Sequence, residues 1–103
     1  MFYEANYMLG IGKGEERKRV DSDFVKVDQN EFLAMIDDLN ENYRGYKIPM
    51  NKSYEADKEH EVDLIIIEFW SGNENSQNNM RNKEDTWIFA YNEEIMEKLN
   101  KFI

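Results

Sequence analysis

The segment "VDLIIIEFW" at residues 62–70 constrains the fold more than any other stretch of this chain. It is β-branched and nearly continuous in apolar residues, with only Asp63 and Glu68 interrupting it. A strand with one solvated face alternates apolar and polar side chains, whereas a strand covered on both faces does not. The sequence therefore predicts a sheet in which residues 62–70 form a central strand.

Four further segments are expected to be extended. Aromatic and β-branched residues with approximate alternation predict strands over 2–9, 23–27 and 86–91. Residues 46–50 are also expected to be extended, and Pro49 confines them to a sheet edge or a strand end. The polar segment 71–85, by contrast, is expected to be a loop.

Two segments carry the apolar spacing of amphipathic helices. Asp28 is expected to cap the first helix, with Glu31 three residues later completing a capping-box-like pair. Its apolar stripe is Phe32, Met35, Ile36, Leu39 and Tyr43, and Asn42 and Gly45 suit its end, Gly45 in the left-handed conformation. Asn92 is expected to cap the second helix, whose stripe is Ile95, Leu99 and Phe102, with Met96 and Ile103 beside them.

The predicted order is β-β-α-β-β-β-α within one domain over residues 1–103. Two amphipathic helices and an apolar sheet indicate an α+β two-layer sandwich with a mainly antiparallel sheet of four to five strands. The longest uninterrupted apolar run, Leu64 to Ile67, is too short to cross a bilayer, so we expect a soluble, cytoplasmic protein without membrane contact.

Composition excludes several kinds of chemistry. The chain has no cysteine, so disulfides, zinc-thiolate sites and cysteine nucleophiles are ruled out. Lys and Arg total 13 against 22 Asp and Glu, a net charge of −9. A chain this acidic is not expected to bind nucleic acid directly through a broad basic face.

The stretch "LGIGKGEERKR" at residues 9–19 resembles a phosphate-binding loop only in its glycines. No Ser or Thr follows Lys13, and Glu15 stands where a dinucleotide fingerprint requires glycine. We expect a hairpin loop in which glycine permits positive φ. Its basic residues form a candidate partner contact on an otherwise acidic chain: Lys13, Arg17, Lys18 and Arg19.

The sequence shows no assembled catalytic or metal site, and no cofactor is expected. His60 is the chain's one histidine and lies among carboxylates in "DKEHEVD", where an extended backbone points it away from its neighbours. Asp63 and Glu68 lie five residues apart on opposite faces of one strand, so that strand alone cannot make them an acid/base pair. Asp63 is expected at the exposed end of the strand, and Glu68 at an edge or paired with a lysine.

The acidic residues form a more regular pattern than the composition alone requires. They occupy every second position from residue 55 to 63, and in an extended chain they line one face about 6.7 Å apart. That spacing matches two phosphate steps on one DNA strand, about 6.8 Å. A break near Val62 is needed to reconcile this ribbon with the apolar strand. The candidate partner-binding acids are Glu55, Asp57, Glu59, Glu61 and Asp63, joined by Asp37, Asp38 and Glu41 of the first helix.

These features favour a small acidic inhibitor or antagonist that covers a basic surface of another protein, either a nucleic-acid-binding or a catalytic one. Anti-defence proteins and toxin-immunity proteins act in this manner. One alternative is a small enzyme or ligand-binding domain that uses the Gly10–Gly14 loop and Asp63. A second alternative is a structural subunit that assembles with copies of itself through a sheet edge.

Overall fold

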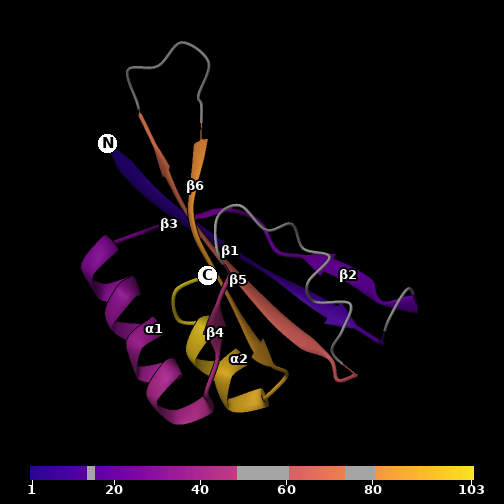
Figure 1. The fold of residues 1–103 in the computed structure, drawn as a ribbon. Helices are drawn as coiled ribbons and strands as arrows, with labels where there is room; N and C mark the ends of the chain where they lie inside the picture. The colour runs from indigo at the N-terminus through magenta and orange to yellow at the C-terminus, as the bar shows by residue number, and fades with distance from the viewer. Residues whose placement is uncertain (14–15, 49–60, 74–80) are drawn as a thin grey trace.

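The structure, a computed structural model, describes residues 1–13, 16–48, 61–73 and 81–103 (Figure 1). This part of the chain forms one sheet and two helices. The elements are β1 (Phe2–Ile11), β2 (Lys18–Asp21), β3 (Val25–Val27), α1 (Gln29–Tyr43), β4 (Tyr46–Lys47), β5 (Leu64–Gly72), β6 (Arg81–Ala90) and α2 (Glu93–Leu99).

The β5 strand lies at the centre of the sheet, as its apolar sequence predicts. The strand order is β2-β1-β5-β6-β4, β3 also pairs with β1, and all these pairings are antiparallel. Eight of the nine β5 residues are buried. The α+β class and the antiparallel sheet are thus confirmed, with six strands in the described residues where four to five were expected.

Both β2 and β3 pair with the same edge of β1. Near the hairpin loop Ile11 lies opposite Lys18, and at the far end Tyr3 lies opposite Val27. Between the two short strands, Ser22 accepts a hydrogen bond from the Tyr7 N–H through its hydroxyl (2.8 Å). The expected hairpin exists, but its loop is shorter than predicted, because Lys18 and Arg19 belong to a strand and not to the connector.

The hairpin formed by β5 and β6 is longer than its polar sequence indicates. Residues 71–85 were expected to be a loop, but β5 continues to Gly72 and β6 begins at Arg81. The register shifts within this hairpin: Phe69 lies opposite Asp85, while Trp70 lies opposite Lys83. Glu84 is therefore an extra residue in β6, as in a β-bulge.

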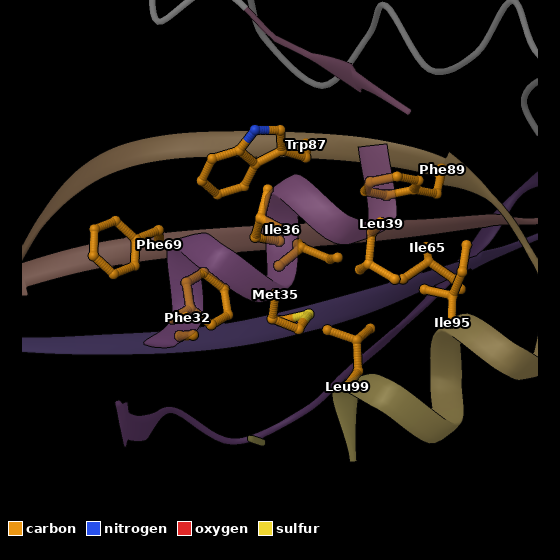
Figure 2. Packing of buried hydrophobic residues seen from close by; sticks show 12 residues of the cluster. Phe32, Met35, Ile36, Leu39, Ile65, Phe69, Trp87, Phe89, Ile95 and Leu99 are labelled. Carbon is orange, nitrogen blue, oxygen red and sulfur yellow. The ribbon is translucent and has the colours of Figure 1, made fainter. Parts of the chain in front are cut away.

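The main core lies between the helices and one face of the sheet. Figure 2 shows Phe32, Ile36 and Leu39 of α1 packed toward the strands, with Ile95 and Leu99 of α2 beside them. The odd-numbered residues of β1, β5 and β6 supply the sheet side of this core: Ala5, Ile65, Ile67, Phe69, Trp87 and Phe89. A smaller cluster contains Met8, Ile48, Leu64, Ile66 and Ile88.

The ends of α1 fit the sequence only in part. The Asp28 side chain caps the helix by accepting a hydrogen bond from the Glu31 N–H (2.9 Å), as predicted. The left-handed residue at the other end is Arg44 (φ 52°), not Gly45. Gly45 is required for a different reason, because a Cβ there would lie 2.2 Å from the Phe89 ring.

Candidate acidic partner-binding surface

The two helices and the N-cap of α1 carry most of the net negative charge of the chain. Asp28 and the two helices together contain eight acidic side chains and one lysine, a net −7 of the −9 for the whole chain. The exposed carboxylates of the helices are here called the acidic helix surface: Glu31, Asp37, Asp38, Glu41, Glu93, Glu94 and Glu97.

The acids of α1 are arranged against the stability of the helix. Asp37 and Glu41 are four residues apart, a spacing at which like charges destabilise a helix by about 0.2–0.5 kcal/mol. The last turn of α1 contains no basic residue. Glu41 therefore lies near the negative end of the helix dipole, where a cation is favoured. Helix stability does not explain this pattern.

Two polar contacts join α1 to α2. The Tyr43 hydroxyl donates a hydrogen bond to the Glu94 carboxylate, and Lys98 Nζ lies 2.7 Å from the Asp38 carboxylate. The hydrogen bond to Glu94 raises the pKa of Tyr43, and the hydrogen bond to Asp38 raises the pKa of Lys98. Asp38 is thus partly neutralised within the surface.

A groove of about 470 Å³ runs between the helices. Ala34 and Met35 of α1 and Phe102 beyond α2 supply its apolar part. Its charged lining comes from Glu31, Asp38, Lys98 and Lys101. The acidic helix surface therefore contains an apolar strip next to its carboxylates.

The acidic ribbon predicted from the sequence falls largely outside the described residues. Glu55, Asp57, Glu59 and His60 lie there, so the structure does not place them. Glu61 and Asp63 are exposed, the backbone bends at Val62, and β5 begins only at Leu64. The backbone thus bends at Val62, where a break was expected, and Asp63 lies at the exposed end of the strand as predicted.

The structure brings Asp63 to the glycine-rich loop. Gly12 has positive φ (97°), as expected of a hairpin glycine, and its N–H donates to Asp63 Oδ1 (2.8 Å). Arg17 is half-buried and donates to the carbonyl oxygens of Gly10 (3.3 Å) and Val62 (3.0 Å). The Asp63 carboxylate thus accepts the Gly12 N–H that a bound phosphate would need. Its negative charge also repels an anion.

The other basic residues of this loop region are Lys13, Lys18 and Arg19, and all three are exposed. Arg19 lies opposite Gly10 in the β1–β2 pairing, and Lys18 lies opposite Ile11. These two side chains therefore point to opposite faces of the sheet. The predicted basic contact is divided between two faces, with Arg17 held against the backbone.

Even-numbered residues of β1 and β5 form the sheet face opposite the helices, and this face neutralises its own carboxylates. The Glu4 side chain, 8% exposed, accepts from Arg81 Nε (2.7 Å). The Glu68 carboxylate, 7% exposed, lies 3.7 Å from Lys83 Nζ, so the predicted lysine pairing is confirmed. The Arg81 guanidinium also lies 4.6 Å from the centre of the Phe24 ring.

The acids of α2 were not recognised as part of a site from the sequence. Glu93, Glu94 and Glu97 are absent from the predicted partner-binding residues. The acids of α2 join those of α1 in one surface only in the folded protein. There Lys98 of α2 contacts Asp38 of α1, which is 60 positions away in the sequence. The sequence signal for this joint surface was the acidic composition of both predicted helices.

Within the described residues, no helix is long and apolar enough to cross a membrane. In the same part of the chain, no group of three or more His, Cys, Asp or Glu residues is arranged to hold a metal ion. No protein-family model, curated protein or solved structure matches this chain.

Proposed function

We propose that this protein is an inhibitor or antagonist that binds a basic surface of another protein through its acidic helix surface. The observation that carries the proposal is the placement of a net −7 on Asp28 and the two helices, including an Asp37–Glu41 pair that helix stability disfavours. In this proposal the domain is a two-layer sandwich whose helix layer makes the contact.

The proposed mechanism has two steps. The field of the acidic helix surface first steers the protein toward a positively charged partner, which raises the association rate. An apolar side chain of the partner then packs on Ala34 and Met35 in the groove between the helices. A second copy of this chain is a poor occupant, because the same surface would bring −7 against −7.

The test compares two variants with equal changes in net charge. Partners are captured from the native host or its competitor, identified and purified, and binding is measured by calorimetry. Asp37→Lys with Glu41→Lys should weaken binding by tenfold or more. Glu16→Lys with Asp21→Lys, both exposed on the β1–β2 hairpin, should change it by less than twofold.

The comparison separates location from net charge. Equal weakening by both pairs of substitutions would show that only total charge matters, which contradicts a helix-specific contact. Full binding by the Asp37→Lys, Glu41→Lys variant would refute the proposed function. An association rate that does not fall with salt would count equally against it.

A further inference from the structure

A pocket of about 340 Å³ lies at the outer edge of α1, on the side of the helix that faces the β5–β6 hairpin. Leu33 of α1, Tyr3 of β1 and Phe69 of β5 supply apolar walls. Gln29, Ser71, Glu84 and Asp85 supply polar groups, and Met1 also lines the pocket. This pocket is distinct from the groove between the helices, which lies on the other side of α1.

The β-bulge gives this pocket two neighbouring carboxylates. In a regular strand Glu84 and Asp85 would point to opposite faces of the sheet. The extra residue in β6 allows both side chains to line the same pocket. Bulges of this kind re-aim side chains and are frequent beside functional sites.

Each carboxylate retains capacity to accept more hydrogen bonds. Glu84 Oε1 accepts from the Ser71 hydroxyl (2.5 Å), and Asp85 Oδ1 lies 2.8 Å from Lys47 Nζ. A carboxylate offers about four acceptor positions, so one donor leaves several unused. The Lys47 side chain is 59% exposed, so its ammonium is a replaceable partner.

Apolar walls below two carboxylates match an alkyl chain that ends in a cation. Long basic side chains lay their methylene groups on apolar surface and keep the charged group on polar partners. A guanidinium presents five donors in a fixed plane and is suited to more than one carboxylate oxygen. The chemistry of the pocket therefore selects arginine.

We propose that the pocket between Leu33, Phe69, Glu84 and Asp85 receives an arginine side chain of the partner protein. That the arginine belongs to a partner protein rests on the proposed function. Leu33, Asp37 and Glu41 follow at four-residue spacing on α1, so two acids of the acidic helix surface lie on the same side of the helix as the pocket residue Leu33. A basic segment lying along this edge would place one arginine in the pocket and further cations beside Asp37 and Glu41.

The test needs no partner, because N-acetyl-arginine amide serves as the probe in an NMR titration of the full chain. A single side chain of this size should bind with a dissociation constant on the order of 1 mM. Amide shifts should centre on Leu33, Ser71, Glu84 and Asp85. N-acetyl-citrulline amide, which has the same shape without the charge, should cause no comparable shifts.

Three variants make the assignment specific. Glu84→Gln with Asp85→Asn should weaken binding at least fivefold, whereas Glu16→Gln with Asp21→Asn should leave it unchanged. Lys47→Ala should strengthen binding about two- to fivefold, because it removes the cation that competes for Asp85. A purely structural role for Glu84 and Asp85 would not produce this gain.

Equal binding of citrulline, shifts centred elsewhere, or weaker binding by the Lys47→Ala variant would overturn the assignment. If the Glu84→Gln, Asp85→Asn variant does not fold, the Lys47→Ala result decides alone. Failure of this titration would leave the proposed function standing wherever the Asp37→Lys, Glu41→Lys variant still loses its partner.

Discussion

At the scale of single residues, the ring of Phe89 packs directly on the backbone of Gly45. A Cβ at Gly45 would meet three ring carbons within 2.5 Å, and Phe89 is a buried core residue that has no room to move. The neighbouring Arg44 adopts the left-handed conformation that glycine accepts more readily. Both adjacent positions therefore favour glycine, but only position 45 has it.

This arrangement gives substitutions of opposite sign. Gly45→Ala should lower the free energy of unfolding by about 1–3 kcal/mol through overpacking. Arg44→Gly should raise it by about 0.5–1 kcal/mol through relief of the left-handed strain. Urea denaturation of both variants measures the effects. A stable Gly45→Ala protein would contradict the close packing of Phe89.

The ion pair of Glu4 with Arg81 is buried on the Glu4 side only. Arg81→Met should lower the free energy of unfolding, because it leaves a carboxylate that is 8% exposed without its cation. The loss should be smaller than for a fully buried pair, since the Arg81 side chain is 44% exposed. Adding Glu4→Gln should recover at least half of the loss. A double-mutant cycle by denaturation checks this, and strict additivity would refute the coupling.

At the scale of elements, the contact of Tyr43 with Glu94 makes the α1–α2 packing sensitive to alkaline pH. The pKa of Tyr43 is raised in the folded protein, so its contribution to stability is complete below the ordinary value of 10.0 and is lost as the pH rises above it. The raised pKa of Lys98 acts in the same direction above 10.5. Helix docking should therefore weaken above about pH 10.

Tyr43→Phe tests this pH dependence. The variant should lose less stability than the wild type between about pH 9 and 11, because it has no hydroxyl to ionise. Thermal unfolding at a series of pH values is the measurement. Identical alkaline losses in both proteins would assign the effect to other groups.

The charge pattern of α1 predicts a separation of stability from binding. Glu41→Lys converts the like-charged pair with Asp37 into an attractive one and places a cation at the helix end. The free energy of unfolding should rise by about 0.3–1 kcal/mol. Partner binding should become weaker at the same time. Loss of both properties would show that Glu41 supports the fold.

Local sequence signals predicted the helices well and the strand ends poorly. The Asp28 cap and the Phe32–Leu39 stripe depend on residues within one or two turns, so they were recognisable in the sequence. The strand segments Lys18–Asp21 and Arg81–Asp85 are polar and are extended because β1 and β5 supply hydrogen-bonding partners. That pairing is a tertiary effect, which single-sequence patterns do not contain.

At the scale of the whole molecule, charge is divided between the two faces of the sheet. The carboxylates of the two helices repel one another, while Glu4 and Glu68 on the opposite face are paired with cations. Raising NaCl from about 0.05 to 0.5 M should therefore raise Tm by about 2–5 °C through screening. The Asp37→Lys, Glu41→Lys variant should gain less. An equal gain in Tm in the wild type and the variant would show that the repulsion does not come from Asp37 and Glu41.

The candidate site was predictable only where it lies on one element. Asp37, Asp38 and Glu41 follow from the helical sequence alone. The pairing of Glu84 with Asp85 on one face does not, because it depends on one extra residue in β6 and on the register with Phe69. The sequence predicted a loop over both residues, because segment 71–85 is polar.

The pairing of β1 with β5 also sets the order in which the chain can fold during synthesis. Phe2 lies opposite Gly72, and Gly10 lies opposite Leu64. The β1 strand therefore has no partner on its inner edge until more than fifty further residues have been made. The β1–β2 hairpin and α1 can form early from local contacts, but the sheet closes only when β5 emerges.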